Sequence, residues 1–461
     1  MSVLISSIKT SFSLKPALPH ANQNSFLAKY AFFILLLIGL TAELFFPYLI
    51  WKKVLPSAVR WLGDISFFII IVISMARMFA FNKIPMAAFM VVAITIIWSV
   101  VAYFEGQAPL TTVWGWWVLF KYPLTGIFTY LQSTWPERMS EYFVKVCMAA
   151  LTMELLVQTG QYFNGQIPGD NLAGTFGRKG VSGLLMFVLV VISIALGQWL
   201  ATGDWKKLVW ALLLGSIASG FGEMKIFPVA VVALAAVALA IHTFRGRDLH
   251  RLGAFIVLFV ITVPAFITFY NRVVSDARGT RRFEEYFEED TRDTYLNKHG
   301  NKALERGRYY LGRGFALQYG WEVIHRDAAT FLFGYGLGTR GESVSFGLVG
   351  AALEQGDFGL TSGTSLLVLM QETGVVGLSV FAIFLGWAIV TMYRDARDDP
   401  DSHTTVIRYG LMVYSIMWPV WLWYHQTWNQ SVSMIMYWAA LGYVLNVGLK
   451  QRKEAEMDIQ L

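Results

Sequence analysis

"VSGLLMFVLVVISIALGQWL", residues 181–200, decides the fold class because it carries no charged side chain over a length that matches a lipid bilayer. A transmembrane α-helix needs about 20 predominantly apolar residues. A second such run, "YAFFILLLIGLTAELFFPYLI" (30–50), contains a single acid, Glu43. Of the 461 residues, 56% are hydrophobic and 15% are charged, whereas about a quarter are charged in soluble domains. The sequence therefore predicts an all-α polytopic membrane protein.

Hydropathy along the chain predicts about twelve transmembrane helices. The predicted spans are 30–50, 61–80, 84–104, 114–132, 142–163, 179–200, 207–222, 226–244, 251–270, 364–393, 405–424 and 430–449. The corresponding organisation is a cytoplasmic tail (1–29), transmembrane helices 1–9 (30–270), a large periplasmic loop between the ninth and tenth helices (271–363), transmembrane helices 10–12 (364–449) and a second cytoplasmic tail (450–461). The seventh span is short and rich in Gly and Ser, so a tilted, broken or re-entrant helix is an alternative there.

Lysine and arginine residues set the predicted orientation, because cytoplasmic loops of membrane proteins carry an excess of them. With the N-terminus inside, cytoplasmic connections such as 245–251 hold Lys or Arg, and the opposite connections 105–113 and 425–429 hold none. Both termini are then cytoplasmic, and the long insert lies outside. The outer connection 51–60 departs from this pattern with Lys52, Lys53 and Arg60.

Composition argues against several classes of function. The net charge of +6 fits the cytoplasmic loops of a membrane protein and does not indicate nucleic-acid binding. Cys147 is the single cysteine, so an intramolecular disulfide and a cysteine-rich metal site are excluded. His299, His325 and His425 lack the spacing of metal ligands. We therefore expect no metal and no cofactor.

The insert ends in a glycine run, "FLFGYGLGTRGES" (331–343). Gly334, Gly336 and Gly338 can take positive φ and let the backbone approach a ligand. Successive N–H groups in such a turn can form an anion-binding concavity, and Arg340 would add a bidentate donor for phosphate. The plain alternative is a connecting loop. The G-x-G-x-G spacing is not a dinucleotide fingerprint, because no βαβ context surrounds it.

Further basic residues lie on the predicted outer side, where charges near the membrane are costly unless they are used. The segment 303–327 is predicted to be helical, since apolar residues recur at three- to five-residue steps, and its arginines would hold a diphosphate or form a solvated face balanced by acids. The predicted substrate-binding residues are Arg178, Lys179, Lys225, Arg306, Arg308, Arg313 and Arg340, together with the three glycines and Glu372.

Carboxylates are candidates for proton transfer. Glu354 and Asp357 precede the tenth span, where either could accept a proton from an attacking sugar hydroxyl, or could simply end a polar loop. Glu372 lies in the first turns of that span, and Glu43 and Glu154 lie in the first and fifth spans. An ionisable residue within the membrane is a functional candidate by default, although it can also pair with a helix end or another charge.

The glycine run followed by "TSLLVLMQETGVVGLSVFAIFLG" (364–386) resembles the bacterial O-antigen polymerase/O-antigen ligase superfamily. The resemblance rests on the late loop, the glycine turn and the Glu372–Gly377 pattern, with "DNLAGTFGRKGVSGLLMFVL" (170–189) as a second local likeness. It implies a C-type glycosyltransferase of the bacterial inner membrane that uses undecaprenyl diphosphate-linked oligosaccharides, holds the diphosphate with arginines and needs no nucleotide sugar or metal. Family ligases carry a His-Asn pair before the glutamate, and this chain has Ser362, Gly363 and Thr364 there.

The sequence thus predicts a polymerase of lipid-linked repeat units of an O-antigen, capsule or exopolysaccharide, acting in the bilayer and beside other polysaccharide-assembly membrane proteins. A ligase that transfers the glycan to another acceptor is the close alternative. A secondary transporter would explain the span count and the intramembrane acids, but not the long late insert. A non-catalytic assembly partner of an export system is a further alternative.

Overall fold

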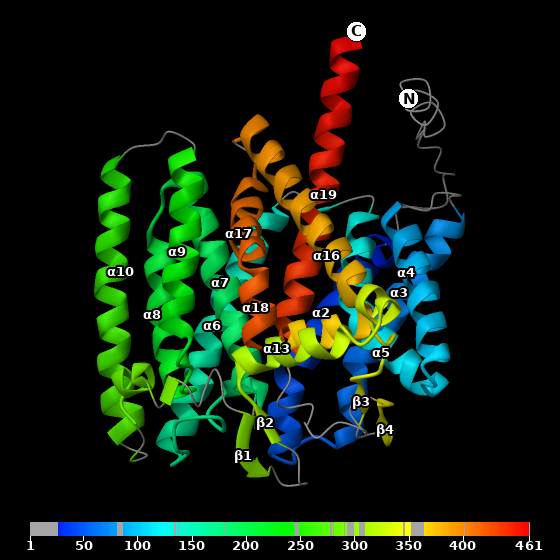
Figure 1. Ribbon diagram of the computed structural model, residues 1–461. Coiled ribbons are helices and arrows are strands. Elements are labelled where there is room, and N and C mark those ends of the chain that lie inside the picture. Colours follow the sequence, from blue (N-terminus) through cyan, green and yellow to red (C-terminus); the bar gives the residue numbers. More distant parts are fainter. Residues whose placement is uncertain are drawn as a thin grey trace.

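The computed structural model describes residues 26–80, 86–132, 135–136, 138–178, 180–244, 249–276, 279, 281–289, 291–292, 299–303, 309–343, 346–351, 364–400 and 402–460. Long helices dominate these residues (Figure 1). They are α2 (Phe26–Trp51), α3 (Trp61–Ala80), α4 (Met86–Phe104), α5 (Pro109–Tyr130), α6 (Met139–Phe163), α7 (Val181–Thr202), α8 (Lys206–Phe221), α9 (Phe227–Phe244), α10 (Leu249–Phe269), α16 (Ser365–Asp398), α17 (Thr405–Ile416), α18 (Trp418–Tyr424) and α19 (Ser431–Gln460).

Seven helices in the described part of the chain are long and apolar enough to cross a membrane. The protein is therefore an all-α membrane protein, as predicted. Each predicted span also coincides with helix in the structure, although the count of twelve crossings stays a prediction. The range 405–424 is not one helix, because Pro419 has no N–H to donate and a new helix, α18, begins at Trp418.

Helix α7 forms the centre of the bundle and is almost wholly buried. Its sequence is apolar on all sides, which is typical of a helix surrounded by others. It packs against α17 where two glycines meet: a methyl group on Gly197 would lie 2.2 Å from the Val406 carbonyl oxygen, and one on Gly410 would lie 2.7 Å from the Ile194 Cα. Small residues of this kind let helix backbones approach closely inside a membrane.

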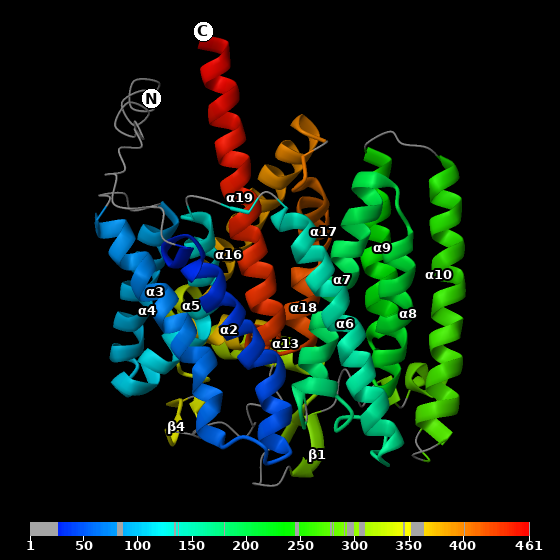
Figure 2. The same ribbon diagram turned by 180° about the vertical axis from the view of Figure 1, so that it is seen from behind.

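The two flanks of the bundle are distinct (Figures 1 and 2). Helices α8, α9 and α10 form one flank, α3, α4 and α5 form the other, and α7, α17, α16 and α19 lie between them. Helix α2 begins and α19 ends at the same end of the bundle, as the predicted topology requires, and the strands of the insert lie at the opposite end. We call this opposite end the insert side.

The insert contains short elements. They are a π-helical turn η3 (Tyr270–Ser275), η4 (Glu284–Phe287), the paired strands β1 (His299–Ala303) and β2 (Tyr309–Leu311), α13 (Arg313–Ile324), α14 (Ala328–Phe333) and the paired strands β3 (Glu342–Ser343) and β4 (Leu348–Val349). The predicted helix over 303–327 is wrong in its first part, since Ala303 and 309–311 are in the paired strands β1 and β2 and the helix starts at Arg313. Helix α13 lies across the bundle axis (Figure 1).

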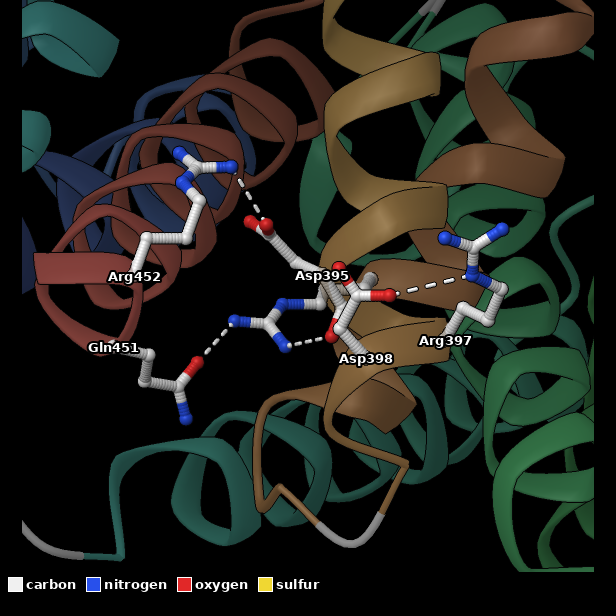
Figure 3. A network of polar contacts seen from close by, with 6 residues as sticks. Asp395, Arg397, Asp398, Gln451 and Arg452 are labelled. Atoms are coloured by element: carbon white, nitrogen blue, oxygen red, sulfur yellow. Dashed lines mark hydrogen bonds and ion pairs between the residues drawn. The ribbon is translucent and has the colours of Figure 1, made fainter. Parts of the chain in front are cut away.

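A polar network joins α16, α17 and α19 at the end opposite the insert side (Figure 3). Arg452 forms a 2.7 Å ion pair with Asp395, and the buried Arg408 donates to the Asp395 carbonyl at 3.1 Å and to Gln451 at 2.8 Å. Gly448 leaves room for Asp395, because a methyl group there would lie 1.9 Å from its carboxylate oxygen. The network fastens the three C-terminal helices to one another.

Candidate functional site

The loop before α7 is held by a polar face of α6. Glu154 accepts hydrogen bonds from the Thr175 backbone N–H at 2.8 Å and from its hydroxyl. Two turns further along, Gln161 donates to the Gly174 carbonyl at 2.9 Å and accepts from its N–H at 3.1 Å. Residues seven apart lie on one face of a helix, so Glu154 and Gln161 of α6 bind the consecutive loop residues Gly174 and Thr175. The intramembrane acid Glu154 therefore has a structural role: it fixes the loop that leads to Arg178.

The glycine turn packs on the bundle. Gly336 and Gly338 have φ of +85° and +82°, as predicted. A methyl group on Gly336 would lie 2.3 Å from the Ala102 backbone nitrogen, and one on Gly338 would lie 2.1 Å from the Thr111 carbonyl oxygen. The close approach that these glycines allow is to the backbones of α4 and α5, and it anchors the end of the insert to the membrane helices.

Helix α16 breaks at Gly374, whose φ of 59° is not helical. The break faces the first glycine of the turn, since a methyl group on Gly374 would lie 2.6 Å from the Gly334 nitrogen. A broken helix leaves carbonyl groups that need other donors. The buried indole N–H of Trp98 is such a donor: it donates to the backbone carbonyl of Thr373 at 3.1 Å and to that of Phe333 at 2.8 Å.

Glu372, two residues before the break, accepts a 3.1 Å hydrogen bond from the backbone N–H of Arg340. Both side chains are buried, with exposed fractions of 4% and 1%. A buried carboxylate is tolerated when backbone donors and a cation accompany it, and the Gly338 backbone and the Arg340 charge contribute here. Glu372 thus links the glycine turn to the Glu-x-Gly pattern, the two motifs that the sequence shows separately.

A cavity of about 270 Å³ lies between the glycine turn, α5 and α16, and we call it the α16 cavity. Its polar lining combines two guanidinium groups with one carboxylate and one amide. The lining residues are Arg60, Trp114, Gly115, Val118, Leu119, Arg340, Gly341, Ser365, Val368, Leu369, Glu372, Gln426 and Trp428. Guanidinium groups offer several donors in a planar fork that suits phosphate oxygens.

A second cavity, of about 390 Å³, lies beside α2, and we call it the α2 cavity. Its lining residues are Ala42, Glu43, Phe46, Pro47, Ile50, Trp51, Arg60, Phe176, Arg178, Gly180, Gly183, Gln430, Ser431 and Val432. Arg60 lines both cavities, so the two spaces adjoin at this residue. Arg178 and Arg340, predicted as phosphate ligands, therefore lie in neighbouring cavities on either side of Arg60.

A third cavity, of about 170 Å³, is almost entirely apolar, and we call it the apolar cavity. It lies between α4, α5, α16 and α19, and Trp98, Phe120, Phe381 and Trp438 are among its walls. Leu119, Leu369 and Trp428 line both this cavity and the α16 cavity. A polar space with two arginines thus adjoins an apolar space, an arrangement that suits an amphipathic ligand.

A charged cluster joins α2, which lines the α2 cavity, to α3 and α5. Lys121 on α5 forms a 3.1 Å ion pair with Asp64 on α3, and Trp117 donates to the same Asp64 oxygen at 3.0 Å. Glu43 on α2 interacts with Lys121, Asp64 and the Ser431 hydroxyl. Ionisable groups at such depth are rare and usually functional.

The remaining predicted residues lie elsewhere. Arg313, at the start of α13, donates to the Tyr424 carbonyl at 2.9 Å and stacks on its ring at 4.1 Å, which holds the insert against the end of α18. The adjacent His425 follows α18, and burial, followed by the nearby Arg313 charge, lowers its pKa to about 3. Lys225 forms a 3.2 Å ion pair with Glu223 on the α8–α10 flank, and neither Arg313 nor Lys225 is among the side chains lining the three cavities.

Five predicted site residues lie outside the described part of the chain, and the structure places none of them. They are Lys179, Arg306, Arg308, Glu354 and Asp357.

Three residues of the site were not predicted as such: Arg60, Asp64 and Lys121. Arg60 had a visible signal, because it breaks the positive-inside pattern in the outer connection 51–60. Asp64 stands near the start of the predicted span 61–80, where an isolated charge is ordinary, whereas Lys121 lies within the span 114–132, where an ionisable residue is itself a signal. Their pairing depends on α3 and α5 being neighbours, which hydropathy does not encode.

In the part of the chain that the structure describes, no group of three or more His, Cys, Asp or Glu side chains could hold a metal ion. Neither a protein-family model nor a curated protein matches the sequence.

Proposed function

We propose that the protein is a membrane glycosyltransferase of the C type that polymerises undecaprenyl diphosphate-linked oligosaccharide repeat units on the periplasmic side of the bacterial inner membrane. The product would be an O-antigen, a capsule or an exopolysaccharide. The observation that supports this best is the meeting of Arg60, Arg178 and Arg340 around two adjoining cavities, one of which borders an apolar cavity. The proposal includes the twelve-span topology with both termini in the cytoplasm.

The chemistry follows from the lining of the cavities. A diphosphate in the α16 cavity would bind Arg60 and Arg340, and the first part of its prenyl chain would enter the apolar cavity. When the sugar–phosphate bond breaks, negative charge builds on the leaving diphosphate, and the guanidinium groups of the buried Arg340 and the exposed Arg60 would stabilise that charge. This catalysis needs neither a metal nor a nucleotide sugar.

Two adjoining arginine-lined cavities favour a polymerase over a ligase. In polymerisation the donor and the acceptor are both diphosphate lipids, so each needs basic side chains and a path for an apolar chain. Arg178 in the α2 cavity would serve the second diphosphate, with Arg60 between the two substrates. A ligase with a different acceptor remains the alternative.

Glu354 and Asp357 remain proposed proton acceptors, and Lys179, Arg306 and Arg308 remain proposed ligands of the substrate.

A secondary transporter is the candidate of another class, and one observation favours it: the charged cluster of Glu43, Asp64 and Lys121 inside the helix bundle. Such clusters carry protons or bind coupling ions in transporters. A transporter would move its substrate without changing the length of any glycan.

The test is the surface polysaccharide of a deletion strain, resolved by gel after complementation with wild type, Arg60→Ala, Arg60→Lys or Arg340→Ala. We expect a ladder with wild type and a single repeat unit in the uncomplemented strain and in both alanine variants. Arg60→Lys should restore little of the polymer ladder, because lysine keeps the positive charge but cannot form the bidentate hydrogen bonds that a guanidinium group makes to phosphate. Arg138→Ala is the matched control, since Arg138 is exposed at the start of α6, away from the cavities.

Other outcomes separate the alternatives. Long chains that remain on the lipid carrier in the deletion strain would indicate a ligase. An unchanged glycan profile in the deletion strain would refute both enzymes, and substrate uptake into vesicles would then test the transporter.

A further inference from the structure

Glu43 is the one carboxylate among the described residues that line the α2 cavity, and Arg60 and Arg178 line the same space. It lies on α2 one turn before Pro47, and its side chain is only partly buried. Gly63 on α3 makes room for it, since a methyl group there would lie 2.7 Å from the Glu43 Oε1. The position of this carboxylate at the cavity wall therefore depends on a neighbouring residue without a side chain.

Charged and titratable groups surround Glu43. Those that are charged or titratable and face it from neighbouring elements are Asp64 of α3, Lys121 and Tyr122 of α5, Arg60 of η1 (Ser57–Arg60) and Arg178 of the loop before α7. Lys121 is engaged by Asp64 at 3.1 Å, and Asp64 also accepts from Trp117. Asp64 thus accepts from two donors inside the bundle, whereas Glu43, which interacts with Lys121 and the Ser431 hydroxyl, also lines the cavity.

We propose that Glu43 is the general base of the glycosyl transfer, an inference that rests on the proposed function. The acceptor sugar would occupy the α2 cavity, with its diphosphate at Arg178 and its reacting hydroxyl at the Glu43 carboxylate. Glu43 takes the hydroxyl proton as the acceptor oxygen forms a bond to the anomeric carbon of the donor. The bond between that carbon and the donor diphosphate breaks, and its electron pair leaves with the diphosphate, held by Arg60 and Arg340. The proton then passes from Glu43 to water.

Glu372 is the rival carboxylate, because it lines the α16 cavity. Its oxygen accepts the Arg340 backbone N–H, and the Gly338 backbone also stabilises its charge. Glu372 is hydrogen-bonded to the glycine turn, so it is suited to positioning Arg340. Glu43 instead lines the α2 cavity together with Arg60 and Arg178. The two roles predict different kinetics.

The experiment uses the full-length protein reconstituted in liposomes with a purified undecaprenyl diphosphate-linked repeat unit, and it follows chain growth by gel. We expect Glu43→Gln to lower kcat by about 10²- to 10⁴-fold with a nearly unchanged KM for the lipid-linked substrate, which is the usual loss when a general base is removed. Glu43→Asp should retain part of the activity, and the acid limb of the pH profile should disappear in Glu43→Gln. Glu372→Gln should instead raise KM, and Glu141→Gln, on the exposed face of α6, should match wild type.

Several results would overturn the proposal. A Glu43→Gln protein that keeps its kcat within a few-fold of wild type shows that Glu43 is not the base. A change confined to KM or to thermal stability assigns it a structural role. A loss of kcat in Glu354→Gln or Asp357→Asn, with Glu43→Gln active, moves the base into the insert. If wild type itself fails to lengthen any chain, the proposed function fails, and this outcome is distinguishable because it does not depend on Glu43.

Discussion

Replacing Gly336 by alanine tests whether the glycine turn works by docking on the bundle. The residue has a φ of +85°, and the added methyl group would lie 2.3 Å from the Ala102 nitrogen and 2.4 Å from its Cα. Both obstacles belong to the backbone of α4, so no side-chain rotation can relieve them. The turn must therefore move away from α4, and Arg340, four residues on, must move with it.

The size of the effect follows from two separate costs. A left-handed conformation costs an alanine about 1–2 kcal/mol, and overpacking of a tightly packed site costs a further 1–3 kcal/mol or so. We expect Gly336→Ala to lower the free energy of unfolding by about 2–5 kcal/mol. Gly347 is the matched control, because its φ is also positive, at +62°, but a methyl group there would meet nothing within 4 Å. Gly347→Ala should carry only the first cost, about 1–2 kcal/mol.

The assay is unfolding of each purified variant in detergent, followed by tryptophan fluorescence, together with the length of glycan made in the complemented strain. Gly336→Ala should unfold at a clearly lower denaturant concentration than Gly347→Ala, and it should make shorter glycans because Arg340 is displaced. Equal destabilisation of the two variants would refute the docking argument, since it would leave the backbone conformation as the whole cost. A stable Gly336→Ala protein with normal glycans would refute it more directly.

Three further predictions concern stability. Glu154→Ala removes the buried acceptor of the Thr175 backbone N–H in the loop before α7. It should lower the free energy of unfolding by about 1.5–3 kcal/mol or more and speed hydrogen exchange in that loop. The control Glu141→Ala, on an exposed face of α6, should leave the free energy of unfolding within about 0.5 kcal/mol of wild type. Gly448→Ala should lower the melting temperature, because its methyl group would clash with the Asp395 carboxylate of the network in Figure 3. The control Gly386→Ala replaces a helical glycine with open space around it, so it should raise the free energy of unfolding by about 0.5–1 kcal/mol. A loss of stability in both variants would contradict this. Burial, followed by the Arg313 charge, lowers the pKa of His425 to about 3, whereas a histidine in the unfolded chain has a pKa of about 6.5. The neutral His425 therefore contributes stability above about pH 6.5, and this contribution is lost as the pH falls towards the folded-state pKa. His425→Asn should therefore flatten the fall in melting temperature between about pH 7 and pH 4.5, and an unchanged slope would show that other groups cause it.

The secondary structure of the insert could be predicted only in part from the sequence. The spacing of Leu304, Leu311, Phe315, Tyr319 and Ile324 predicts one helix, yet the structure has a strand at 309–311 and begins the helix at Arg313. Helix and strand periods are hard to separate over so few residues, and the pairing of β2 with β1 is a contact at a distance that the pattern does not contain. Positive φ at Gly334, Gly336 and Gly338 could be anticipated, because glycine takes that conformation without steric cost and the three residues lie in one loop.

The sequence by itself determined that the chain is an all-α membrane protein, and it placed a helix in each predicted span, although α19 extends well past 449 and 405–424 holds two helices. The reason is physical: a segment in a bilayer must satisfy its own backbone hydrogen bonds, so an apolar run of the right length can only be a helix. Which helices become neighbours is a different matter, because packing inside the bundle depends on shape and on contacts between distant segments. Only the tertiary structure therefore brought Arg60, Arg178 and Arg340 around adjoining cavities, set Glu43 between Lys121 and open space, and turned the glycine run into an anchor for the insert.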